Sequence, residues 1–217
     1  MQIAICCDFD GTITLMDTGK ALLSTLTDKD WQAIDKFVIR GEMGTREALI
    51  QQWGMIEKTT MDEINAIVDE IQIDDSFKEF FNWVNGNKFK FLILSDGFIT
   101  YIKRILDNYK IPVSKFEIKA NDMVLENNKL KLHFLTPECT HGCANCKYSF
   151  VKRLKDDGYK IIYIGDGLSD ILPARSLADI IFAKKDEDLA RELDSDKRLY
   201  IFSDFSDILK KIQKLSL

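Results

Sequence analysis

Apolar positions along the chain fall into two patterns, short unbroken runs and longer stretches with helical spacing. Two of the unbroken runs, 3–7 and 161–164, are each followed by aspartate and glycine. Runs of this kind are typical of strands buried on both faces of a parallel sheet. A third run, 89–94, leads into Ser95, Asp96 and Gly97. The pattern therefore predicts an α/β fold whose strands end in polar turns.

The stretch between the first two predicted strands has helical periodicity throughout. From residue 17 to about residue 87, apolar positions recur three or four residues apart and no strand pattern is present. An all-helical insert at this place can close over the ends of the strands. We expect a core of residues 1–16 plus 75–217 and a helical cap of residues 17–74.

Strand and helix patterns alternate again after residue 89. Residues 116–134 predict a strand and a hairpin that turns at Asn127-Asn128, and the helix before the strand at 160–164 is expected from about Asn145 to Asp157. Further strands are expected near Ile180 and at 199–202. The predicted fold is a Rossmann-like parallel-sheet core, with the helical cap inserted after the first strand and a small β-hairpin.

Four aspartates follow two of the predicted strands. Asp8 and Asp10 come after the first strand, and Asp166 and Asp170 come after the strand at 160–164. In open α/β sheets ligands bind beyond the carboxyl ends of the strands, so we expect these side chains to share one site. Like charges this close disfavour each other's ionisation unless they share a proton or a cation. Oxygen ligands of this kind suit a hard divalent cation, most simply Mg²⁺.

The order of four motifs resembles the haloacid dehalogenase (HAD) superfamily, in its phosphatase branch beside the phosphoserine phosphatases. The motifs are Asp8-Phe9-Asp10-Gly11-Thr12, Ser95 after a strand, Lys147 at the start of a helix, and Gly165 to Asp170. They extend over nearly the whole chain. The resemblance implies an HAD-like core and a Mg²⁺-dependent phosphomonoester hydrolase.

The resemblance also implies a role for each matching residue. Asp8 would attack phosphorus to form an aspartyl phosphate, while Asp10 would protonate the leaving oxygen and then activate water. Mg²⁺ would be held by Asp8, the backbone carbonyl of Asp10, and Asp166, with support from Asp170. The phosphate group would be bound by Ser95 and Gly97 after the second strand, by Lys147 at the start of the helix, and by Asp10.

The predicted cap contains the residues expected to select the substrate: Asp17, Gln52 and Trp53. Where phosphoserine phosphatases offer an arginine to the amino-acid carboxylate, this chain has Gln52, which argues against phosphoserine. The opening through Ile13 and Thr14, the turn Trp53-Gly54-Met55-Ile56 and the cysteines before Lys147 more closely resemble the methionine-salvage phosphatases that act on 2-hydroxy-3-keto-5-methylthiopentenyl-1-phosphate. Met16, Trp53 and Met55 could form an apolar wall for the methylthio group or could be buried cap core.

Two kinds of alternative function stay open at this point. Phosphoserine phosphatase and phosphoethanolamine or phosphocholine phosphatase differ from the first interpretation only in the alcohol half of the substrate. A receiver-like domain belongs to another class, because it gathers acids, a hydroxyl and a lysine at a sheet edge to be phosphorylated without turnover. Steady turnover of a phosphate ester separates it from an enzyme.

A group of cysteines and a histidine precedes Lys147. The group is Cys139, His141, Cys143 and Cys146. Their spacing allows a zinc site, but structural zinc sites usually draw their second pair of ligands from farther away, so a reduced, hydrogen-bonded loop is the favoured interpretation. The odd total of five cysteines fits a reducing cytoplasm better than a disulfide framework.

Charge and hydropathy exclude several classes of function. The chain has 217 residues and a formal net charge of −5, which gives no support for nucleic-acid binding, whose usual mark is a basic face. No apolar run reaches the roughly 18 residues that a membrane-spanning helix needs. The first strand begins at residue 3, which leaves no room for a signal peptide. We expect a cytoplasmic protein that binds a small phosphate ester and neither nucleic acid nor membrane.

Overall fold

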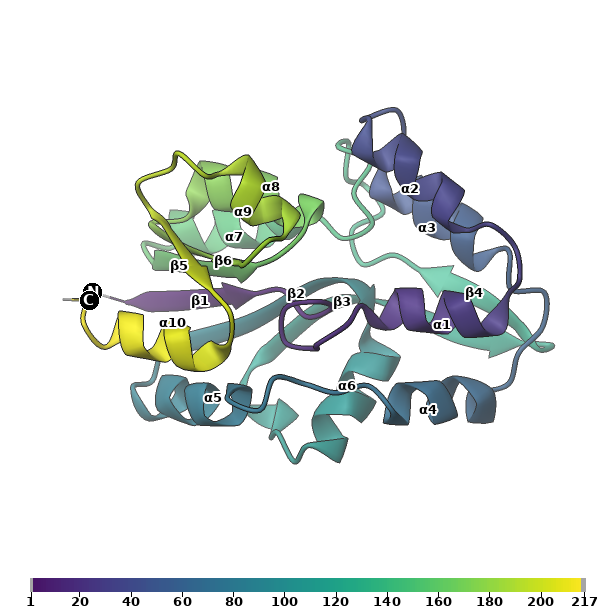
Figure 1. Ribbon diagram of the computed structural model, residues 1–217, viewed down its shortest axis with the longest axis horizontal. Helices are drawn as coiled ribbons and strands as arrows, with labels where there is room; N and C mark the ends of the chain where they lie inside the picture. Colours follow the sequence, from purple (N-terminus) through teal and green to yellow (C-terminus); the bar gives the residue numbers. More distant parts are fainter. Residues whose placement is uncertain (1, 216–217) are drawn as a thin grey trace.

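The computed structural model describes residues 2–215 and contains a central sheet between two layers of helices (Figure 1). The strand order is β4-β3-β2-β1-β5-β6-β7, and every neighbouring pair is parallel except β3 with β4. The strands are β1 (Ile3–Cys7), β2 (Lys90–Phe98), β3 (Glu117–Glu126), β4 (Lys129–His133), β5 (Lys160–Gly165), β6 (Ile180–Lys184) and β7 (Leu199–Phe202). The predicted α/β class and parallel-sheet core are confirmed.

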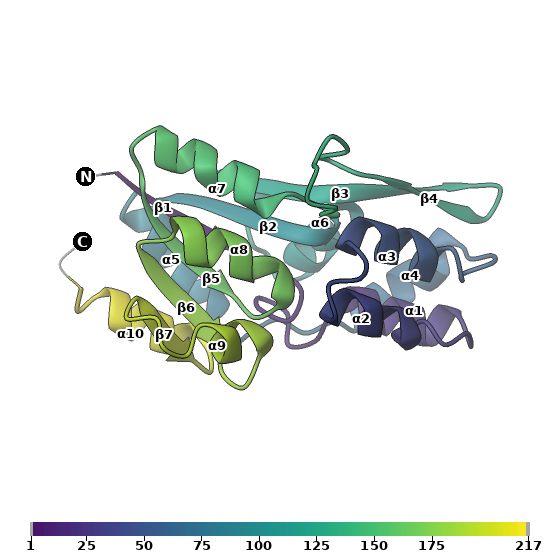
Figure 2. The ribbon, with the colours of Figure 1, turned by 90° about the horizontal axis from the view of Figure 1, so that it is seen from above.

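Helices cover both faces of the sheet. One face carries α7 (Lys147–Asp156), α8 (Leu168–Leu177) and α9 (Asp188–Glu192), and the other carries α5 (Phe77–Gly86), α6 (Ile99–Asn108) and α10 (Phe205–Ile212). A short 3₁₀ helix, η1 (Val113–Lys115), precedes β3. The remaining helices, α1 (Thr18–Leu26), α2 (Gln32–Ile39), α3 (Thr45–Trp53) and α4 (Met61–Asp69), lie together at one end of the sheet (Figure 2).

The unbroken apolar runs are explained by burial of each strand on both faces. Along β1, Ile3, Ile5 and Cys7 belong to the core beneath α5, α6 and α10, whereas Ala4 and Cys6 belong to the core beneath α7 and α8. Successive side chains of a strand point to opposite faces, so both sets must be apolar when helices cover both faces. Strand β1 lies in the middle of the sheet, between β2 and β5.

The helices α1 to α4 form an insert between β1 and β2, as expected. The two connections between this insert and the core run side by side, because Thr14 and Ile73 form an antiparallel bridge. Helix α4 also packs against α6, and Leu22 of α1 belongs to the same apolar cluster as the core helices. The division at residues 17–74 into a separate cap domain stays a prediction.

Several element boundaries differ from those expected. Strand β2 continues through Ser95 to Phe98, and its pairing with β3 is irregular between Leu94 and Phe98. Helix α7 begins at Lys147 and not near residue 145, and the short helix α9 was not predicted. The predicted hairpin is confirmed, since Asn127 and Asn128 have positive φ values of 51° and 60°. Within residues 2–215, no helix is long and apolar enough to cross a membrane.

Candidate active site

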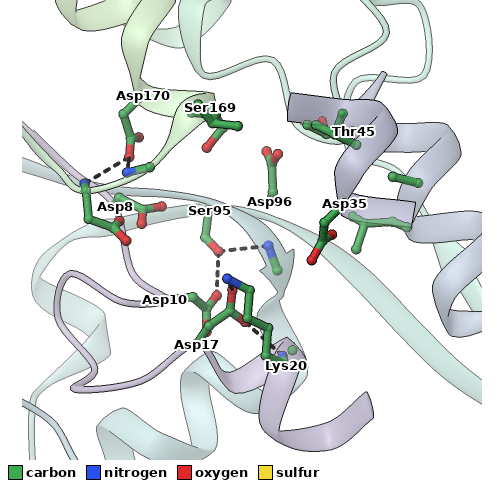
Figure 3. Close-up of a pocket in the computed structure, with 18 of the residues that line it drawn as sticks. Asp8, Asp10, Asp17, Lys20, Asp35, Thr45, Ser95, Asp96, Ser169 and Asp170 are labelled. Carbon is green, nitrogen blue, oxygen red and sulfur yellow. Dashed lines mark hydrogen bonds and ion pairs between the residues drawn. The ribbon is translucent and has the colours of Figure 1, made fainter. Parts of the chain in front are cut away.

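The four predicted aspartates meet at one cavity of about 320 Å³ beside the carboxyl ends of β1, β2 and β5 (Figure 3). Strand β1 ends at Cys7, so Asp8 and Asp10 lie in the turn that follows it. In that turn Gly11 has a φ of 83°, a conformation that glycine adopts without a steric penalty. This turn brings both carboxylates to the cavity.

Asp8, Lys147 and Asp170 form a buried ionic cluster. The ammonium of Lys147 lies 2.6 Å from Asp8 Oδ1 and 2.7 Å from Asp170 Oδ1. Burial alone would lower the pKa of Lys147, but Asp170 and Asp8 raise it well above its usual value, so Lys147 stays charged. Burial raises the pKa of Asp8 well above its usual value. The positive charge of Lys147 lowers this pKa in part, while the nearby Asp170 and Asp166 raise it further.

Asp166 completes a group of three carboxylates, which come from the turns after β1 and β5 and from the first turn of α8. Oxygen atoms of Asp8, Asp166 and Asp170 all lie within 4.8 Å of one another, and Thr12 Oγ1 donates a hydrogen bond of 2.8 Å to Asp166. Burial, followed by repulsion from Asp170, raises the pKa of Asp166 to about 6. When all three are ionised, the single ammonium of Lys147 leaves two negative charges without a partner.

Asp170 uses all of its hydrogen-bonding capacity inside the protein. Its Oδ1 accepts from Lys147 and from the hydroxyl of Tyr163, at 2.7 Å each. Its Oδ2 accepts from the backbone N–H groups of Asp166 and Gly167, at 3.2 and 3.1 Å. Asp170 therefore positions Lys147 and the turn before α8. Tyr163 was not among the predicted site residues. A polar hydroxyl within an otherwise apolar run is the sequence signal that could have identified it.

The side chain of Asp10 lies apart from these three carboxylates. It accepts hydrogen bonds from Ser95 Oγ at 3.1 Å, Tyr101 Oη at 2.9 Å and the backbone N–H of Thr18 at 3.2 Å. Burial and then repulsion from Asp17 raise its pKa to about 6, although the three hydrogen bonds act in the opposite direction. Tyr101 was also missed, because it lies on the apolar stripe of α6 and has the pattern of a core residue.

The predicted phosphate-binding residues Ser95, Gly97 and Lys147 all line the cavity. The N–H of Gly97 donates to Ser95 Oγ at 2.8 Å, which orients the serine hydroxyl towards Asp10. A Cβ atom at Gly97 would lie 1.8 Å from Tyr101 Oη and 2.6 Å from Asp10 Oδ2. Only glycine fits there without displacing the hydroxyl of Tyr101 and the carboxylate of Asp10 that accepts from it.

The residues predicted to select the substrate line the same cavity, but they are held in different ways. Asp17 caps α1 by accepting from Lys20 N at 2.9 Å. The amide of Gln52 is already engaged, since Nε2 donates to Asp35 Oδ1 at 2.8 Å and to the backbone carbonyl of Trp31. Trp53 is 2% exposed, and its indole Nε1 has no hydrogen-bond partner among residues 2–215.

The apolar wall of the cavity differs from the one considered from the sequence. Among the described residues that line the cavity, neither Met16 nor Met55 is present, and Met16 is 54% exposed. The interpretation of these methionines as a wall is therefore wrong. The wall is formed by apolar residues of α2, α3 and the end of β2: Val38, Ile39, Ala48, Leu49, Trp53 and Phe98. Asp35 faces them from α2 and was not predicted (Figure 3).

The cysteine loop, residues 134–146 between β4 and α7, brings its four predicted side chains together. The sulfur atoms of Cys139, Cys143 and Cys146 and a ring nitrogen of His141 all lie within 4.8 Å of one another. The cysteines are free thiols. Burial, and then the neighbouring Cys139, raise the pKa of Cys143 to about 12.

Comparison with protein families and curated proteins gives long matches. The model of a family described as Putative Phosphatase matches residues 3–203. The chain is 26% identical over 215 residues to the 2-hydroxy-3-keto-5-methylthiopentenyl-1-phosphate phosphatase of Bacillus velezensis, which covers 97% of this chain and 90% of the relative. It is 29% identical over 220 residues to the phosphatase of the same name from Bacillus mycoides, covering 99% and 98% of the two chains.

Solved structures with low sequence identity share the fold. A HAD family hydrolase of Salmonella enterica serovar Typhi superposes with a TM-score of 0.76 at 19% identity, covering 99% of this chain and 72% of that one. A phospho-aspartyl intermediate analogue of phosphoserine phosphatase superposes with a TM-score of 0.77 at 16% identity, covering 97% and 98%. At these identities the structures establish the architecture and leave the substrate open.

Proposed function

This chain belongs to the putative phosphatase family, and from that premise we propose that it hydrolyses a small phosphate monoester with Mg²⁺ through a covalent phosphate on Asp8. It is a phosphatase of the HAD type, so the receiver-like alternative without turnover is set aside. The observation that carries the mechanism is the convergence of Asp8, Asp166 and Lys147, from three separate elements, on one point beside the cavity.

The residues present fit a hard divalent cation. Asp8, Asp166 and the backbone carbonyl of Asp10 would hold Mg²⁺, whose ligands in proteins are oxygen atoms. A Cβ at Gly11 would lie 2.5 Å from Asp166 Oδ2, so glycine allows the turns after β1 and β5 to approach closely. The saturated carboxylate of Asp170 would meet the ion only by way of water. When bound, Mg²⁺ supplies positive charge that reduces the repulsion between the carboxylates and a phosphate.

The side chains then divide the work. Asp8 attacks phosphorus in line while the bond from phosphorus to the leaving oxygen breaks. Lys147 and Ser95 hold phosphoryl oxygens, and Lys147 also fixes the orientation of Asp8 through its 2.6 Å contact. Asp10, whose raised pKa keeps a proton available near neutral pH, donates that proton to the leaving oxygen. It then takes a proton from the water that cleaves the aspartyl phosphate, which restores both aspartates.

For the substrate we propose 2-hydroxy-3-keto-5-methylthiopentenyl-1-phosphate, as in methionine salvage. Support comes from the names of the curated relatives and from the apolar wall, in which Val38, Leu49 and Phe98 would pack against a methylthio group. The unpaired indole N–H of Trp53 would donate to an oxygen of the substrate. No arginine lines the cavity within residues 2–215, so the carboxylate of phosphoserine lacks a bidentate partner.

A second candidate substrate, phosphoethanolamine or phosphocholine, is favoured by one observation. Asp17 and Asp35 both line the cavity on the side of the insert, and of these two Asp17 alone has a lysine, Lys20, at ion-pair distance (Figure 3). Carboxylates in this position would attract the ammonium group of either ester.

A substrate panel tests the proposed function. The purified protein with Mg²⁺ is assayed for kcat/KM on the methylthio ester, phosphoethanolamine, phosphocholine and phosphoserine. We expect the methylthio ester to have the highest value, and Asp35→Asn to leave that value almost unchanged. A higher value for phosphoethanolamine that falls in Asp35→Asn would favour the second candidate. Equal or faster turnover of phosphoserine would overturn both substrates.

A further inference from the structure

The cysteine loop contains a second candidate metal site, separate from the aspartates of the active site. Its four ligand atoms lie within 4.8 Å of one another, and Cys139 Sγ is 3.8 Å from His141 Nδ1. Zinc bonds of about 2.3 Å to sulfur and about 2.0–2.1 Å to nitrogen separate tetrahedral ligands by about 3.5–3.8 Å. The four atoms therefore need only a small contraction to enclose one ion.

We propose that Cys139, His141, Cys143 and Cys146 bind a structural Zn²⁺ ion. Three thiolates and one imidazole are soft and borderline ligands that select zinc over the magnesium suited to carboxylates. On binding, the three thiols release three protons and the imidazole binds in its neutral form, so the occupied site has a net charge of −1. With all four positions taken by protein, the site has no open position for substrate, which is the pattern of a structural site.

The backbone around the ligands is already fixed in place. Thr136 accepts two hydrogen bonds from this backbone. Its hydroxyl oxygen accepts from the backbone N–H of Cys146 at 2.8 Å, and its carbonyl oxygen accepts from the backbone N–H of Cys139 at 3.1 Å. The hydroxyl of Ser149 donates to the carbonyl of Cys146 at 2.8 Å. Cys146 is buried while His141 is exposed, so an ion can enter from the His141 side. The first and last ligands are thus held before metal binds, which lowers the entropic cost of binding.

The position of the loop indicates what the ion would stabilise. Arg46 of α3 donates from its guanidinium to the Pro137 carbonyl at 2.6 Å and from its backbone to the Gly142 carbonyl at 3.0 Å. Ala144 N donates to the hydroxyl of Thr45, also on α3. Lys147, which contacts Asp8, directly follows the last ligand. A zinc ion here would fix the loop that joins the helical insert to the lysine of the active site.

The two histidines of the chain provide a matched pair of variants, because His133 is exposed on β4 and is not part of the group. Full-length protein purified without chelator is analysed for metals, and stripped protein is titrated with Co²⁺ under reducing conditions. We expect one zinc per chain and the thiolate-to-cobalt absorption of a tetrahedral site. His141→Ala and Cys143→Ser should lose both signals, whereas His133→Ala should keep them.

A protease assay measures the effect on the loop without an activity assay, so it is independent of the proposed phosphatase function. A glutamate-specific protease cuts after the exposed Glu138, and mass spectrometry follows that cleavage. If zinc binds only the closed form of the loop, a free zinc concentration of 100 times Kd lowers the population of the open form about 100-fold. The rate of cleavage after Glu138 should fall by the same factor.

Three results would overturn the zinc proposal. One is the absence of zinc together with absence of the cobalt signal, or zinc replaced by another metal. The second is a disulfide among the three cysteines in freshly reduced protein. The third is metal binding by His141→Ala with the same affinity as His133→Ala. Circular dichroism of both histidine variants shows whether either has lost its fold.

Discussion

Tyr101→Phe is the sharpest test of the role assigned to Asp10. The substitution removes only the hydroxyl that donates to Asp10 Oδ2 at 2.9 Å, and Tyr101 is 2% exposed, so water does not readily replace it. A hydrogen bond to a charged group is worth about 1.5–3 kcal/mol. At about 1.36 kcal/mol for each pKa unit, its loss should raise the pKa of Asp10 by about 1–2 units above the value near 6.

The measurement is the pH dependence of kcat/KM at saturating Mg²⁺. As a general acid Asp10 must be protonated, so the rate should fall as pH rises through its pKa. In Tyr101→Phe this alkaline limb should move upwards by about 1–2 pH units, following the change in pKa.

Tyr109→Phe is the matched control, because Tyr109 lies at the far end of the same helix and its hydroxyl contacts the Ile71 carbonyl at 3.5 Å. Its profile should coincide with that of the unmodified chain. An alkaline limb in Tyr101→Phe that stays in place or moves to lower pH would refute the assignment of Asp10 as the acid.

Three other predictions concern the same cavity. Gly97→Ala should lose most activity because the new Cβ would meet Asp10, whereas Gly86→Ala, with open space around it, should keep it; equal kcat/KM values would contradict this. Asp8→Asn should lose turnover. It should nevertheless unfold at a higher temperature in EDTA, because one of three clustered carboxylates becomes neutral. Residual turnover or a lower Tm would count against the role assigned to Asp8. In EDTA the free energy of unfolding should fall as pH rises from about 4 to 7. Folding raises the pKa of Asp10 and Asp166 from 3.8 to about 6, so over this range the folded state holds protons that the unfolded state has already released. Urea unfolding at pH 5 and pH 7 measures this, and Mg²⁺ should add more stability at pH 7; a flat or rising profile would contradict the shifts.

The sequence by itself determined the sheet and the centre of the site. The runs 3–7 and 161–164 are apolar at every position because both faces of β1 and β5 are covered, and that pattern is visible without coordinates. Since parallel strands end at the same edge, aspartates placed after both runs had to converge. The meeting of Asp8 and Asp166 was therefore predictable from local patterns and topology, whereas Lys147 was placed with them by the resemblance of the motif order to the HAD phosphatases.

The tertiary structure alone decided how each group is held and what lines the rest of the cavity. Tyr101 has the spacing of a core residue, and only the close approach of α6 to the turn after β1 makes it a partner of Asp10. Likewise Gln52 is engaged by Asp35, while Met16 lies away from the cavity. Such contacts depend on which turn of one helix meets another element. Helical periodicity identifies the buried face of a helix but not the element that packs against it. The sequence pattern therefore could not separate the residues that line the cavity from those that lie in the core.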